Sequence, residues 1–127
     1  MRKVSQGGDS DSSAVAAYLK YVLSKNLRKG VPGLHMYLTG VAFTRYGMSL
    51  EDLLWERPSE FVKLLKEYFQ SGDVVSSILE VILKELTRTQ EGEEALKALM
   101  NGDEEAFREK AVKALEKEAK SWVKNLI

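Results

Sequence analysis

The sequence predicts an all-α protein, a compact bundle of six or seven helices around a buried central helix at about 73–87, with a long C-terminal helix. Three observations lead to this prediction. Apolar residues recur at intervals of three and four, which is the period of an amphipathic helix. Capping residues, glycines and prolines stand where such segments begin and end. The length of 127 residues suits one core-forming domain.

The N-terminal part divides into a tail and the first helix. Residues 1–9 are polar and lack periodicity, so we expect a flexible tail followed by a single helical domain over 10–127. The first helix is expected to begin within 10–13, among capping side chains, and to end near Lys29, because Gly30 and Pro32 follow. Its apolar stripe consists of Val15, Tyr18, Leu19, Val22, Leu23 and Leu27.

The segment 34–46 is compatible with two structures. A helix places its larger apolar residues on one side, whereas a hairpin would turn at Thr39-Gly40 between alternating residues. A helix is favoured, because an isolated two-stranded hairpin is marginally stable. Within a helix, Gly40 costs up to about 1 kcal/mol relative to alanine, which indicates that another helix passes close to it.

Two further helices follow between Ser49 and Gly72. Ser49 is a predicted N-cap with Asp52 three positions later. This short helix ends before Pro58, because the residue before a proline avoids helical angles. Pro58 suits the first turn of the next helix, which we expect to stop at Gly72.

The last three helices are predicted from Asp73 onwards. Asp73 is expected to cap the central helix, whose residues to about Thr87 are apolar nearly all round and therefore typical of a buried element. A short helix after Thr89 ends at Asn101-Gly102, and Asp103 caps a final helix that reaches about residue 126.

Part of this pattern resembles the small helical output domains of archaeal signalling and regulatory proteins. The resemblance covers about 40 residues and implies a regulatory or partner-binding role without catalytic residues. It is carried by the run Tyr46-Gly47-Met48-Ser49-Leu50-Glu51-Asp52-Leu53, by Pro58-Ser59-Glu60-Phe61, and by Leu65, Phe69, Gly72, Leu79 and Ile82.

The composition excludes several kinds of chemical site. The chain has no cysteine and one histidine, His35, which rules out thiolate metal sites and His–His pairs. His35 is expected at the surface or at a loop edge. The acidic cluster within 91–105 lacks calcium-loop spacing and is typical of helix N-termini. We therefore expect no enzyme, and no catalytic, metal or cofactor-binding residue.

No apolar run is long enough for a membrane span, and no charged segment leads into an apolar signal core. The sequence therefore predicts a cytoplasmic protein without membrane contact. Six amide side chains and no cysteine, beside 30% charged residues, are typical of thermophiles, although Glu and Lys are also good helix formers.

The basic N-terminal third supports an alternative function in nucleic-acid binding. Residues 1–46 carry seven basic and two acidic residues, a net charge of +5, together with four of the five tyrosines. A helix-turn-helix over 43–54 is rejected, because its second helix would present acids to DNA. The residues proposed to contact nucleic acid or another anion are Lys20, Lys25, Arg28, Lys29 and Arg45.

The favoured function is a non-catalytic interaction or regulatory module that binds a protein partner or a second copy of itself. Large apolar residues crowd the end of the last helix, where they dock either on the chain's own core or on a partner. The candidate partner contacts are Trp122, Val123 and Leu126.

Overall fold

The computed structural model describes the backbone of residues 2–126 and the side chains of residues 11–126. Within residues 2–126 there are seven α-helices, one short 3-10 helix and no strand, which confirms the all-α fold and the helix over 34–46. The elements are α1 (Arg2–Gly30), α2 (Pro32–Tyr46), α3 (Leu50–Glu56), α4 (Pro58–Phe69), α5 (Gly72–Ile82), η1 (Lys84–Arg88), α6 (Gln90–Asn101) and α7 (Glu104–Leu126).

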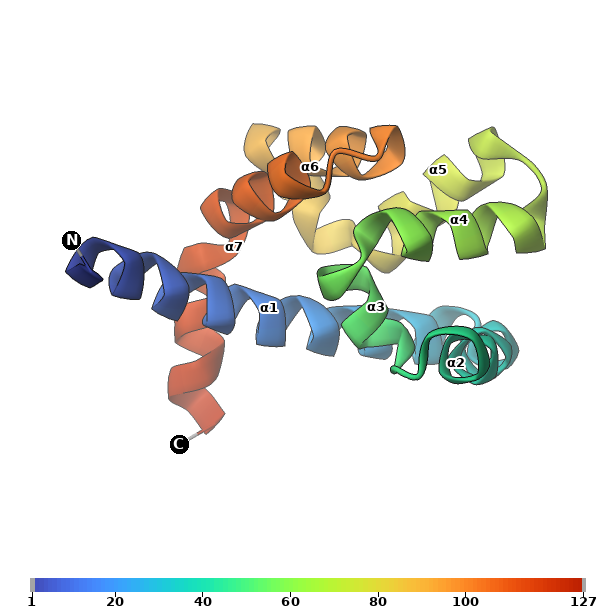
Figure 1. Ribbon diagram of the computed structural model, residues 1–127, viewed down its shortest axis with the longest axis horizontal. Helices are drawn as coiled ribbons and strands as arrows, with labels where there is room; N and C mark the ends of the chain where they lie inside the picture. Colours follow the sequence, from blue (N-terminus) through green and yellow to red (C-terminus); the bar gives the residue numbers. More distant parts are fainter. Residues whose placement is uncertain (1, 127) are drawn as a thin grey trace.

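Helix α1 runs along the length of the molecule and organises the other elements (Figure 1). Helices α4, α5 and α6 lie in a layer on one side of α1, and α2 and α3 lie along its C-terminal half. The long helix α7 leaves the layer beside α6 and crosses α1. This crossing joins the last helix of the chain to the first.

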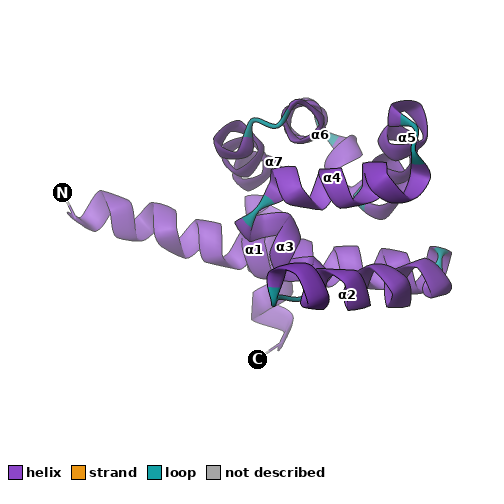
Figure 2. Cartoon of the chain, turned by 45° about the vertical axis from the view of Figure 1, so that its right-hand side comes forward, coloured by secondary structure: helices purple, strands orange, loops and turns teal. Residues whose placement is uncertain are grey.

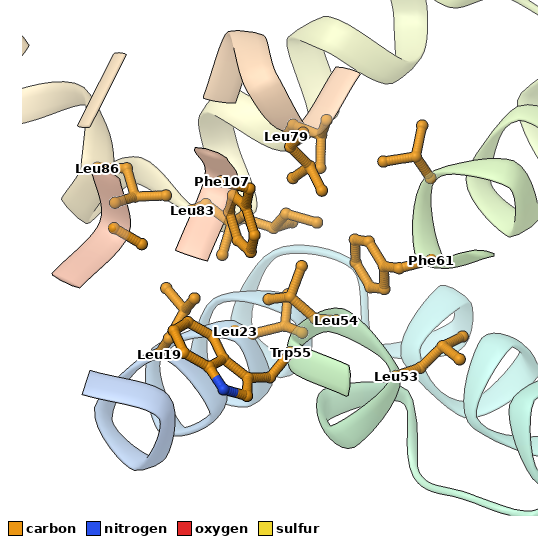
Figure 3. Packing of buried hydrophobic residues seen from close by; sticks show 14 of the residues in the cluster. Leu19, Leu23, Leu53, Leu54, Trp55, Phe61, Leu79, Leu83, Leu86 and Phe107 are labelled. Atoms are coloured by element: carbon orange, nitrogen blue, oxygen red, sulfur yellow. The ribbon is translucent and has the colours of Figure 1, made fainter. Parts of the chain in front are cut away.

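The core lies between α1 and this layer (Figure 3). In that view, Leu19 and Leu23 of α1 lie among residues of α3, α4, α5, η1 and α7. Burial of large apolar side chains removes them from water and is the main stabilising contribution to folding. The residues labelled around the two leucines are Leu53, Leu54, Trp55, Phe61, Leu79, Leu83, Leu86 and Phe107, all of them buried.

The expected central helix at 73–87 differs from the structure. Helix α5 ends at Ile82 and is followed by the 3-10 helix, so the segment is two shorter elements. Val75, Leu79 and Ile82 are buried, but Val74 and Val81 are exposed on the other side. Neighbouring helices cover only one side of α5. Because the other side is also apolar, the sequence predicted wrongly that both sides are buried. The central element is α1.

Most helix ends agree with the capping residues. The Ser49 hydroxyl accepts a hydrogen bond from the Asp52 amide at 3.0 Å, and the Asp103 carboxylate accepts one from Ala106 at 3.2 Å. The predicted end of α4 at Gly72 is wrong, because the helix ends at Phe69 and Gln70 takes the left-handed conformation that closes it. Ser71, and not Asp73, is the N-cap of α5, since its hydroxyl accepts from Val74.

The first helix begins at Arg2, earlier than the capping residues within 10–13 predict. The side chains of residues 1–10 lie outside the described part of the structure, and the flexible tail over 1–9 stays a prediction. The predicted C-terminal end agrees with the structure, because α1 stops at Gly30 and Pro32 opens α2.

Candidate interaction surface

Helix α2 contains an unusual stretch of sequence for this chain. Between Lys29 and Arg45 there are fifteen consecutive residues without Asp, Glu, Lys or Arg, although such residues make up 30% of the whole. A surface helix is normally charged on its solvent side. Figure 2 shows α2 at the edge of the molecule, below α4 and in front of α1, so this helix has a solvent side.

The inner side of α2 is recognised by its burial. Leu38 and Ala42 are fully buried, while Leu34 and Val41 are half-buried against the core. His35 also faces inward and makes a 2.9 Å hydrogen bond with the Glu51 carboxylate of α3. The role of His35 is therefore to hold α2 against α3, and its side chain is less exposed than the sequence predicts.

The outer side of α2 consists of three rows of residues spaced by seven, which corresponds to two helical turns. The middle row is glycine, Gly33 and Gly40, and a Cβ atom added at either would meet no described atom within 4 Å. The expectation that another helix of the chain passes close to Gly40 is therefore wrong. We call this outer side the α2 face, formed by Gly33, Met36, Tyr37, Gly40, Phe43 and Thr44.

The large side chains of the α2 face are exposed apolar groups. Met36 is 76% exposed, Phe43 57% and Tyr37 55%. The Thr44 hydroxyl donates to the Gly40 carbonyl of its own helix at 2.9 Å, so its hydrogen atom is satisfied inside α2. The described face thus offers apolar atoms and no charge.

The apolar surface continues from α2 onto α4. The rings of Tyr37 and Tyr68 lie 5.3 Å apart, and Tyr68 meets Phe69 edge-on at 4.9 Å. Such tilted and edge-to-face contacts are favourable for aromatic rings. Tyr68 remains 49% exposed, so it extends the α2 face sideways.

Paired charges border this surface. Arg45 forms an ion pair with Glu67 of α4 at 2.6 Å, and this hydrogen bond raises the pKa of the Arg45 guanidinium. The Tyr46 hydroxyl donates to Glu60 at 2.7 Å, which raises the pKa of that phenol. Both contacts tie the C-terminal end of α2 to α4, and they form a polar border at that end of the uncharged surface.

The five basic residues proposed for nucleic-acid contact are not one set of unpaired cations. Lys20 forms an ion pair with Asp52 of α3 at 2.9 Å, which lowers the pKa of that carboxyl, and Arg45 is paired with Glu67. The Lys25 ammonium lies 5.4 Å above the Tyr21 ring. Arg28 and Lys29 are exposed at the end of α1 and make no ion pair with another described side chain.

The proposed partner contacts at the end of α7 have different surroundings. Trp122 packs on α1, with its ring 5.2 Å from Tyr21 in a stacked arrangement and 5.7 Å from Tyr18. Val123 is half-buried and Leu126 is exposed. Docking on the chain's own helix thus accounts for Trp122, whereas a partner contact through Leu126 stays a prediction.

A groove and a buried polar pair are two further features of the structure. An open groove of about 1230 Å³ lies between α5 and α6, and its lining mixes acids such as Glu80 and Glu93 with Lys97 and apolar residues. Buried polar groups occur where Asn26 donates to the Ile82 carbonyl at 2.8 Å and to Glu85 at 3.0 Å. This pair connects α1 to the end of α5, which is a structural role.

Among residues 11–126, no group of three acidic or histidine side chains could hold a metal ion.

No described helix is long and apolar enough to cross a lipid bilayer. No family model, curated protein or solved structure matches the chain. The resemblance to archaeal helical output domains therefore stays a prediction.

The sequence analysis did not predict the exposed surface residues of α2 and α4, although the uncharged run between Lys29 and Arg45 was a visible signal. These residues are Met36, Tyr37, Phe43 and Tyr68.

Proposed function

We propose that this chain is a non-catalytic interaction module that binds a protein partner through the α2 face. The observation that carries this proposal is an exposed helix side without a charge in a chain rich in charges. Exposed apolar surface is unfavourable in water, and contiguous patches rimmed by polar residues are typical of protein interaction sites. A regulatory role, as the predicted resemblance implies, would act through this contact.

The composition of the α2 face also fits a protein partner better than a nucleic acid. Aromatic residues and methionine are enriched at the centres of protein interfaces, while lysine and acidic residues are depleted there. Nucleic acids are bound mainly through lysine and arginine contacts to phosphates. The α2 face has two aromatic residues, one methionine and no cation.

Site-specific photo-crosslinking in the native cells tests this function. A photoreactive amino acid replaces Met36 on the α2 face, and in a control variant it replaces Lys113, which is exposed on α7. We expect discrete crosslinked protein species from position 36, formed either with another protein or with a second copy, and none above background from position 113. No species specific to position 36 would contradict the proposal.

A further inference from the structure

We propose that the occupant of the α2 face is the same face of a second copy, with the two α2 helices antiparallel about a twofold axis near Gly40. This inference rests on the proposed function and names the partner. Three properties of the face support it: its lack of charge, its shape and its area.

The charge pattern favours a second copy over a charged partner. The α2 face presents no charge that would attract an acidic or a basic surface, and the ions at its rim, Arg45 and Glu67, already neutralise each other. The surface that complements an uncharged apolar face is another such face, and every copy of the chain carries one. The formal net charge of the chain is zero, so two copies do not repel each other as whole molecules.

The shape of the α2 face is self-complementary. The glycine row is a shallow channel between a row formed by Met36 and Phe43 and a row formed by Tyr37 and Thr44. The backbone conformation at position 40 does not require glycine, because among the described glycines only Gly47 and Gly102 have a positive φ. A close approach by an external helix does require a small residue, and glycine permits axes near the lower end of the usual 8–10 Å range.

An antiparallel arrangement uses both walls of this channel. With Gly40 on the twofold axis, each wall meets the same wall of the other copy, so Met36 of one copy faces Phe43 of the other, and Tyr37 faces Thr44. Each contact occurs twice, as the symmetry of a two-chain interface demands. The Met36–Phe43 pairs place a methionine side chain against an aromatic ring, which is a favourable contact, and Tyr68 beside Tyr37 enlarges the Tyr37–Thr44 pairs. The dipoles of the two helices are then opposed, which is favourable.

The area of the face agrees with a stable dimer. Met36, Tyr37, Phe43 and Tyr68 each expose about half or more of their surface. Large side chains of this kind bury roughly 150–250 Å² each, so the four offer about 400 Å² of apolar surface. Since about 60% of an interface is apolar, the corresponding patch is about 700 Å² per copy. This value is close to the ~800 Å² per partner of standard interfaces and exceeds that of most crystal contacts.

The oligomeric state of the purified full-length chain tests the inference. Sedimentation equilibrium of the wild type is expected to show a dimer at micromolar concentrations. Phe43→Glu is expected to weaken self-association by at least about 30-fold, because it places a charge in the centre of the interface. The matched control is Val81→Glu on α5, because both native side chains are 57% exposed. We expect the control to remain dimeric and both variants to keep their helical circular dichroism.

Disulfide crosslinking tests the geometry, because the chain has no native cysteine. Gly40→Cys is expected to form a disulfide between copies under mild oxidation, and Val81→Cys is not. An equimolar mixture of Tyr37→Cys and Thr44→Cys is expected to give mixed dimers in an antiparallel pair, whereas a parallel pair would crosslink Tyr37→Cys to itself. Parallel crosslinking overturns the antiparallel geometry.

A wild-type chain that stays monomeric at about 100 μM would overturn the self-association inference. The proposed function survives that result if photo-crosslinking at position 36 captures a different protein in the native cells. If position 36 gives no specific species and the purified chain is also monomeric, both proposals fail. The two experiments thus separate the identity of the partner from the existence of an interaction surface.

Discussion

Gly40 and Gly92 both lie inside helices, but their surroundings are opposite. A Cβ atom at Gly92 would lie 1.7 Å from the Leu86 carbonyl oxygen, which belongs to the backbone of η1. Glycine at this position allows α6 to pack directly on η1, and the Gly92 amide also donates to the Thr89 cap at 3.0 Å. At Gly40 the same atom would enter open space. Packing within one chain requires glycine at position 92, but it does not require glycine at position 40.

Alanine substitutions at these two glycines are expected to have opposite effects on stability. Gly92→Ala should lower the free energy of unfolding by about 3 kcal/mol, because the backbone of η1 must move. Gly40→Ala should raise that free energy by about 0.5–1 kcal/mol in the monomer, because alanine is a better helix former. Urea unfolding below the dimerisation concentration measures both. Equal stability of Gly92→Ala and the wild type would contradict the close contact.

The elements α1 and α7 are the first and last helices of the chain, and their crossing closes the fold. Phe107, Ala111, Leu115 and Ala119 of α7 are buried at intervals of four, so one side of this helix faces the core. Trp122 continues that contact onto the tyrosines of α1. Burial is also the main reason that the pKa of the Tyr18 phenol is raised. The end of α7 is therefore held by aromatic packing up to Trp122.

Truncation of the Trp122 side chain tests this docking. Trp122→Ala is expected to lower the free energy of unfolding by about 2 kcal/mol, somewhat less than for a fully buried aromatic residue, because Trp122 is only half-buried. Leu126→Ala, four residues later and exposed, is expected to change it by less than about 0.5 kcal/mol. Thermal or urea unfolding followed by circular dichroism compares the two. Equal effects would show that Trp122 contributes no more than an exposed residue.

At the scale of the whole molecule, ion pairs between helices cancel part of the charge asymmetry of the sequence. The excess of basic residues before position 46 is met by acids from later helices, through Lys20–Asp52 and Arg45–Glu67. These partners are 32 and 22 residues apart in the chain and become neighbours on folding. Of the five proposed cations, Lys25, Arg28 and Lys29 have no ion pair with a described side chain, and three cations are few for phosphate binding.

We therefore expect no retardation of duplex DNA or RNA in a gel-shift experiment at about 50 mM salt, where phosphate contacts are strong. The control is the double variant Arg28→Glu and Lys29→Glu, which removes the exposed basic end of α1. Retardation by the wild type that the double variant abolishes would contradict this expectation. It would favour the alternative function in nucleic-acid binding.

The helix boundaries were largely predictable because they depend on contacts within one turn. Ser49 and Asp103 accept hydrogen bonds from amides three residues later, and Pro58 restricts the residue before it, so these effects are readable from the order of residues. The predicted boundary at Gly72 is wrong for a related reason. Gln70 adopts a left-handed conformation that glycine accommodates more easily, and Ser71 then competes successfully with Asp73 as a cap.

The interaction surface was not predicted, because the exposure of a side chain depends on distant segments. Periodicity predicted one apolar side for a helix over 34–46 and a wholly buried helix over 73–87. In the structure, Phe43 and Val81 are on helix sides that no described element covers. The order of residues thus sets where each helix begins and ends. Packing among α1, α4 and α7 sets which sides remain exposed, because only folding brings those helices together.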